Sequence, residues 1–83
     1  MNPHKTLEKI LSGSKNIRFA DMVRLIQAFG FRLARVSGSH HIFVRSGIPE
    51  ILNLQNAGGQ AKPYQVTQFI KLIESRGLTL EDR

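Results

Sequence analysis

The chain has 83 residues, 41% of them hydrophobic and 22% charged, which is enough for one globular domain with a single modest core. It contains no cysteine, which excludes disulfides, a thiolate nucleophile and a cysteine-ligated zinc site, and which fits a cytoplasmic location. The apolar runs are short, so we expect neither a signal peptide nor a membrane span. The net charge of +6 favours anionic partners.

The positive charge is concentrated in the middle of the chain. Between Asp21 and Glu74 the only acidic residue is Glu50, whereas this window holds six basic residues: Arg24, Arg32, Arg35, Arg45, Lys62 and Lys71. The other acidic residues gather toward the two ends, as Glu8, Asp21, Glu74, Glu81 and Asp82. A basic middle predicts binding to RNA or DNA first and to an anionic membrane second. A basic surface that serves only solubility is the alternative.

Three segments have the pattern of helices. Asn2-Pro3 resembles an N-cap followed by proline at the first helical position, and it opens a short helix from Pro3 to Leu11. After a connection over 13–18, apolar residues at helical spacing predict a helix from Ala20 to Phe29, with Gly30 closing it. A third helix follows Lys62-Pro63 and ends at Gly77. The apolar residues that predict the two longer helices are Met22, Leu25, Ile26 and Phe29, and Val66, Phe69, Ile70 and Ile73.

Between the two longer helices lie three strand-like runs. They cover Phe31 to Val36, His40 to Arg45 and Glu50 to Leu54, with a turn predicted at 46–49 and an end to the third strand at 56–59. The order α-α-β-β-β-α predicts an α+β fold in which residues 20–77 form the unit of the double-stranded-RNA-binding domain (dsRBD). In that unit a three-stranded antiparallel sheet carries both helices on one face and leaves the other open for a ligand. We expect an N-terminal helix and linker over 1–19 and the dsRBD-like domain over 20–83.

Two adjacent histidines follow a small turn at the start of the second strand. Strand alternation places His40, Ile42 and Val44 on one face and His41, Phe43 and Arg45 on the other. We expect Ile42 and Val44 to face the core. His41 and Arg45 would then lie on the face that the helices leave open, and His40 would lie at the start of the strand, where the turn could direct it outward. Because neighbouring strand residues point apart, the histidines form a poor metal site, and we expect no cofactor. Either imidazole could transfer protons near neutral pH or could simply begin a strand.

Several residues around these histidines suit contacts to phosphate. Arg32, Arg35 and Arg45 lie on neighbouring strands, and Lys62 lies at a helix N-terminus. In the turn, Ser37 and Ser39 could donate to phosphate, although serine in a turn more often serves the backbone, and Gly38 is expected to supply a positive φ angle. We expect Tyr64 to be packed, with stacking on a base as the alternative.

Two motifs together resemble the HicA family of toxin–antitoxin systems. They are Gly30-Phe31-Arg32-Leu33 and Val36-Ser37-Gly38-Ser39-His40-His41-Ile42-Phe43, and the resemblance extends over about residues 20–78. It implies a dsRBD-like fold and the activity of an mRNA interferase, a small ribonuclease that is neutralised by a HicB antitoxin. The Gly38-Ser39-His40 signature matches the family's catalytic histidine position. The resemblance therefore implies a catalytic role for His40, with His41 as the fallback.

The chain departs from the family pattern in two places. Many members carry a Pro-x-His element after the third strand, where this chain has Leu54-Gln55-Asn56-Ala57-Gly58-Gly59 and Lys62-Pro63-Tyr64, and the first helix is an addition. Our preferred function is a metal-independent endoribonuclease that acts on mRNA and is controlled by an antitoxin, as in a stress response. The alternatives are a non-catalytic RNA-binding module, which would read the shape of A-form RNA, and a small interaction domain.

Overall fold

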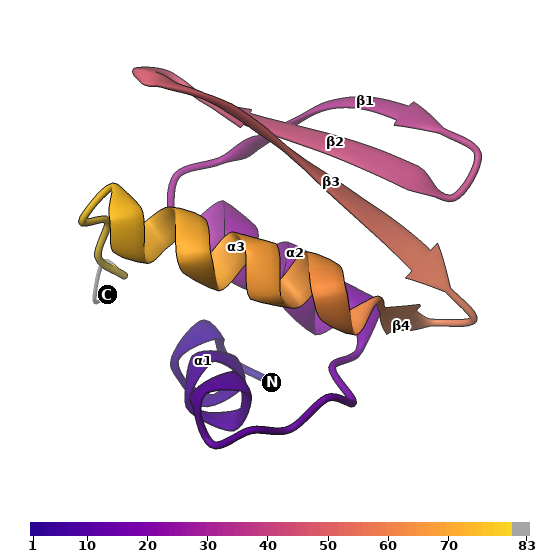
Figure 1. Cartoon of the computed structure of the whole chain (residues 1–83). Coiled ribbons are helices and arrows are strands. Elements are labelled where there is room, and N and C mark those ends of the chain that lie inside the picture. Colours follow the sequence, from indigo (N-terminus) through magenta and orange to yellow (C-terminus); the bar gives the residue numbers. More distant parts are fainter. Residues whose placement is uncertain (81–83) are drawn as a thin grey trace.

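The computed structural model describes residues 1–80; the acidic residues Glu81 and Asp82 lie outside the described residues. The chain folds into three layers: an antiparallel sheet, a pair of helices on one of its faces, and the N-terminal helix beneath that pair (Figure 1). The prediction of an α+β, dsRBD-like α-β-β-β-α unit with both helices on one face and an extra short N-terminal helix is confirmed. In chain order the elements are α1 (Pro3–Leu11), α2 (Phe19–Ala28), β1 (Arg32–Ser37), β2 (His40–Arg45), β3 (Ile48–Ala57), β4 (Gln60–Ala61) and α3 (Pro63–Ser75).

The helix ends follow the local signals in the sequence. The Asn2 side chain caps α1 by accepting a hydrogen bond from the Lys5 amide at 2.9 Å, and Pro3 begins the helix, as predicted. Gly30 follows α2 with a φ of +90°, a conformation that strongly favours glycine, and the chain turns there into β1. Proline also begins α3, where its missing N–H costs no helical hydrogen bond.

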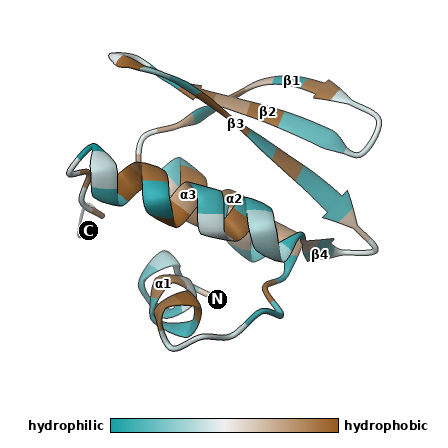
Figure 2. Ribbon diagram, in the orientation of Figure 1, coloured by the Kyte–Doolittle hydropathy of each residue, from teal (hydrophilic) through white to brown (hydrophobic). Residues whose placement is uncertain are grey.

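The core lies between the sheet and the two longer helices. Hydrophobic and hydrophilic residues alternate in part of β3, as expected for a strand with one covered face, whereas β2 carries a continuous hydrophobic run in its middle (Figure 2). Burial of a large apolar side chain contributes roughly 1.5–3 kcal/mol, so this layer supplies much of the stability. Its most deeply buried large side chains are Phe43, Phe69, Ile17, Met22, Leu25, Ile26 and Leu54.

The structure reverses the predicted faces of β2. Phe43 is fully buried, with 0% of its surface exposed, whereas Ile42 is only partly buried. The reason lies in β3, which pairs Phe43 with Leu52 and His41 with Leu54, but Ile42 with the polar Asn53. The helices therefore cover the face that the leucines make apolar. The expectation that Ile42 and Val44 face the core and that His41 and Arg45 lie on the open face was wrong.

The third strand is longer than predicted. The second hairpin turn consists of Ser46 and Gly47, with a φ of +83° at Gly47, so Ile48 and Pro49 already belong to β3. Proline is tolerated there because β4 pairs with β3 only at Asn56 and Ala57, which leaves Pro49 at a free sheet edge. The two-residue β4 was not predicted, because so short a strand has no recognisable period.

Candidate functional site

The sheet has one face that no helix covers, and we call it the open face. Residues that lie directly opposite each other in the pairing share a face, so the register identifies its members. They come from three strands: Arg32, Arg35 and Ser37 of β1; His40, Ile42 and Val44 of β2; and Asn53 and Gln55 of β3. Ile51, two residues before Asn53 along β3, is exposed and joins them by strand alternation. The face therefore combines two guanidinium groups, one imidazole and two carboxamides.

His40 is an exposed residue of the open face. It begins β2, opposite Ser37 on one side and Gln55 on the other. Its Nδ1 lies 3.2 Å from the Oδ1 of Asn53, which is two residues along β3 from Gln55. Among residues 1–80 the ring has no second hydrogen-bond partner. Nδ1 of His40 is thus hydrogen-bonded to Asn53, and Nε2 is accessible to a ligand on the open face.

His41 has the opposite environment, on the helix side of the sheet. Its ring meets the ring of Phe19, the first residue of α2, edge to face with centroids 4.7 Å apart. Its Nδ1 lies 3.2 Å from the Ser39 carbonyl oxygen, which accepts the bond. These contacts tie the β1–β2 turn to α2, which is a structural role.

A short turn over Gly38 and Ser39 precedes His40. Gly38 adopts a φ of +59°, so the predicted positive φ is confirmed. Ser37 lies on the open face directly opposite His40, and the Ser39 carbonyl also accepts from the Asn56 amide at 2.9 Å. The turn is therefore anchored to β3, and the Ser37 hydroxyl lies on the same face as the imidazole.

The structure divides the predicted basic residues into two groups. Arg32 and Arg35 are exposed on the open face, opposite Val44 and Ile42. Arg45 instead lies on the helix side, where its Nη1 donates to the Phe29 carbonyl oxygen at 2.8 Å. A cation at the C-terminal end of a helix, here α2, is favoured by the helix dipole. Arg45 is therefore not brought together with the other two arginines.

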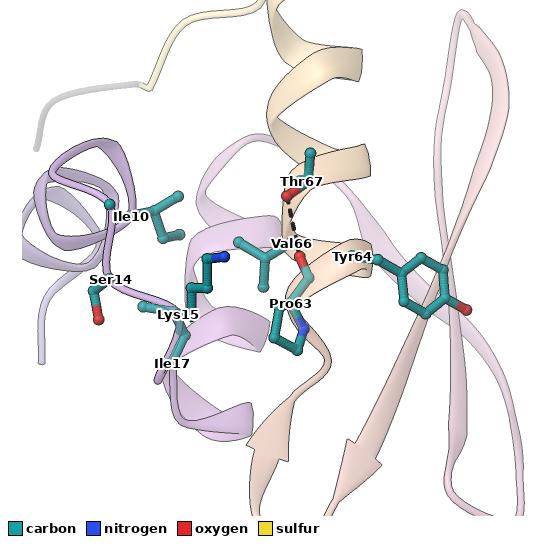
Figure 3. A pocket seen from close by; sticks show the side chains of 9 residues that line it. Ile10, Ser14, Lys15, Ile17, Pro63, Tyr64, Val66 and Thr67 are labelled. Carbon is teal, nitrogen blue, oxygen red and sulfur yellow. Dashed lines mark hydrogen bonds between the residues drawn. The ribbon is translucent and has the colours of Figure 1, made fainter.

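Lys62 and Tyr64 lie at the start of α3, away from the open face. Lys62 is half-buried at the N-cap, and Tyr64 is 59% exposed, so the expectation that Tyr64 is packed was wrong. Figure 3 shows its ring pointing away from a cavity of about 360 Å³ between the α1–α2 connection and α3. Apolar side chains of that cavity belong to Ile10, Ile17, Pro63 and Val66. The cavity lies on the far side of the helices from His40.

Two residues of the open face were not singled out from the sequence, Asn53 and Gln55. A signal for them exists in the run Leu52-Asn53-Leu54-Gln55, where leucine alternates with a carboxamide. Alternation of this kind predicts that both carboxamides share the uncovered face. Their position beside His40, however, depends on how β3 pairs with β2.

The described part of the chain offers neither a cluster of metal ligands nor a membrane-spanning helix. Within residues 1–80, no three histidine, cysteine or acidic side chains lie together as the ligands of a metal ion would. None of the helices in these residues is long and apolar enough to cross a bilayer.

We compared the chain with models of protein families, with curated proteins and with solved structures, and the first of these comparisons identifies its family. Residues 19–80, well over half of the chain, match the family model described as HicA toxin of bacterial toxin–antitoxin systems. No curated protein and no solved structure matches the chain. The match begins at the first residue of α2, so α1 lies outside it. Both the fold and the match agree with the resemblance seen in the sequence, and the chain belongs to the HicA toxin family.

Proposed function

We propose that this chain is an endoribonuclease toxin that cleaves mRNA, with His40 as its proton-transfer residue. The observation that carries the proposal is the position of His40, exposed on the open face between Ser37 and Gln55. The family's members are toxins, and the family is known for mRNA interferases. An imidazole is suited to this chemistry because its unperturbed pKa range lies close to neutral pH.

The proposed reaction uses the RNA's own 2′-hydroxyl as the nucleophile. Nε2 of His40 takes the proton as the 2′-oxygen attacks the adjacent phosphorus, and the bond from phosphorus to the 5′-oxygen breaks. The leaving oxygen receives a proton either from the imidazolium so formed or from water. General acid–base catalysis of this kind contributes about 10²–10⁴ in rate.

Binding is expected to be mainly electrostatic. Arg32 and Arg35 lie on β1, the strand that pairs with β2, and share the open face with His40. They can therefore contact phosphates and balance charge on the phosphorane. The turn residues Ser37, Gly38 and Ser39 can donate to phosphate beside them. Arg45 and Lys62, also predicted to bind RNA, would act through the general positive charge of the chain, because neither lies on the open face. Members of this family belong to toxin–antitoxin systems, so we expect a HicB-type antitoxin partner that covers His40.

The test compares two neighbouring histidines on opposite sides of the sheet. Purified wild type, His40→Ala and His41→Ala are incubated with RNA in the presence of EDTA, and fragments are measured beside thermal unfolding. His40→Ala should lose at least about a hundredfold in cleavage and change stability by no more than about 0.5 kcal/mol. His41→Ala should lose about 1–2 kcal/mol of stability with its contacts to Phe19 and Ser39, yet still cleave.

Each other result has a definite meaning. Full activity in a folded His40→Ala would move the assignment to His41, and full activity in both variants would end the proposal of a catalytic histidine. A wild type that binds RNA but never cuts it would favour the non-catalytic binding module. Cleavage that stops in EDTA would contradict metal-independent catalysis.

A further inference from the structure

We infer that Asn53 is a positioning residue for His40, one that fixes which ring nitrogen is free to act as the base. This inference rests on the proposed function, because it assigns a role within the same site. Asn53 and His40 come from different strands and lie thirteen residues apart in sequence. Their contact exists only because β2 and β3 pair in this register.

The register places the two side chains within reach of each other. Asn53 lies directly opposite Ile42, so it shares the open face with His40 and is its diagonal neighbour across the two strands. Diagonal neighbours on one sheet face are close enough for long polar side chains to meet. The distance of 3.2 Å between Nδ1 of His40 and Oδ1 of Asn53 is that of a hydrogen bond.

The chemistry of the two groups then determines the tautomer. The carboxamide oxygen of Asn53 faces the ring, and because an oxygen of this kind can only accept, Nδ1 of His40 carries the hydrogen in this arrangement. A neutral imidazole has a single N–H, and the lone pair is therefore on Nε2. That is the form a general base requires, with its lone pair on the nitrogen that has no partner among residues 1–80. Once Nε2 is protonated, Nδ1 still donates to Asn53, so the contact persists through the reaction.

The direct test measures the tautomer and does not depend on cleavage. Nitrogen chemical shifts of the imidazole distinguish protonated from unprotonated Nδ1 and Nε2 in the folded protein. They are measured at a pH high enough for the ring to be neutral, so that they report which tautomer is present. Wild type should show His40 mainly as the Nδ1–H form, and Asn53→Ala should shift the population toward a mixture of both tautomers. Gln55→Ala is the matched control, because Gln55 is a carboxamide on the same face, directly opposite His40, with no bond to its ring.

Kinetics supply the second readout. Asn53→Ala should lower kcat about fivefold to tenfold, the effect of losing one neutral hydrogen bond, while Gln55→Ala leaves kcat within about twofold. Asn53→Asp keeps an acceptor but adds a negative charge that stabilises imidazolium. The acidic limb of its pH–rate profile should therefore move up by about one pH unit, with activity retained on the alkaline side.

The results separate the inference from the proposed function. An unchanged tautomer in Asn53→Ala, or equal kinetic losses in Asn53→Ala and Gln55→Ala, would overturn the positioning role even if His40→Ala is inactive. A tautomer shift in Asn53→Ala together with a fully active His40→Ala would instead keep the contact and reject His40 as the base.

Discussion

The two faces of the sheet give neighbouring residues of one strand opposite roles. His40 lies on the open face, bonded to Asn53 and exposed, whereas His41 lies on the helix side against Phe19. The two imidazoles have the same chemistry, and only the side of the strand differs. The pair therefore consists of one exposed histidine, for which we propose the role in catalysis, and one histidine that packs against α2.

The arginines repeat this contrast at a larger scale. Arg35 is exposed on the open face, while Arg45 on the helix side donates to the Phe29 carbonyl. The Arg35 guanidinium can meet a phosphate on the open face, whereas the Arg45 guanidinium lies on the other side of the sheet, at the end of α2. Counting basic residues along the chain therefore overestimates how many of them can form one binding surface.

The largest effect that tests this contrast concerns stability. Phe43→Ala removes a fully buried ring from the helix side and should cost about 3–5 kcal/mol. Ile42→Thr, at the adjacent position on the open face, keeps a β-branched side chain and should cost less than about 1 kcal/mol. Chemical denaturation of both variants measures the difference. An Ile42→Thr variant at least as destabilised as Phe43→Ala would contradict the division into two faces.

Much of the fold could be predicted because its signals are local. Met22, Leu25 and Ile26 follow the helical period within a single segment. Pro3 is the first residue of α1, and Gly30 follows the C-cap of α2, so both helix ends lie where these residues predicted them. The sides of β2 could not be predicted from β2 alone, because both of its faces carry apolar residues. They are settled by Leu52 and Leu54, which lie on another strand, so this choice depends on pairing between distant segments.

The site shows the same limit. His40 could be proposed from the sequence because its turn lies beside it and the Gly38-Ser39-His40 signature belongs to one continuous stretch. Asn53 could not be linked to His40, because their contact requires the register of β2 on β3. Arginine is a residue type that suits phosphate, so the sequence alone favours that role for Arg45. Its hydrogen bond to the Phe29 carbonyl could not be predicted, because it depends on where the end of α2 lies relative to β2.

A smaller effect distinguishes the two groups of arginines. For single-stranded RNA the slope of log K against log salt changes by about 0.7 for each phosphate that the protein no longer neutralises. Arg32→Gln and Arg35→Gln should each flatten the slope by about this amount with little change in stability. Arg45→Gln should flatten the slope by less than either of these variants and lose about 1–2 kcal/mol of stability, because the Phe29 carbonyl loses a charged donor. RNA titrations at several salt concentrations and thermal melts measure both quantities, and a slope flattened as much in Arg45→Gln as in the other two variants would place it at the RNA surface instead.

The smallest effect concerns an ion pair between β3 and the end of α3. Arg76 follows α3 and donates to both carboxylate oxygens of Glu50, with Nη2 at 2.8 Å from each oxygen and Nε at 3.1 Å from Oε1. The hydrogen bond from Arg76, with a further contribution from the backbone, holds the pKa of Glu50 below its ordinary value of 4.5. Glu50 lies on the same strand as Asn53, so one strand carries both a proposed site contact and a contact to the helix layer.

The lowered pKa of Glu50 fixes the direction of the pH effect. The folded state favours the ionised carboxylate, so the pair's contribution is complete above the unfolded pKa, near 4.5, and is lost as the pH falls through the lower folded pKa. Glu50→Gln should therefore melt slightly below wild type at pH 7, and the difference should shrink as the pH falls below 4.5. The difference should also shrink at high salt, because the pair is exposed. RNA cleavage by Glu50→Gln at pH 7 should match wild type, since the carboxylate has no contact with His40. A melting difference that persists unchanged to pH 3 would show that Glu50 acts through packing and not through its charge.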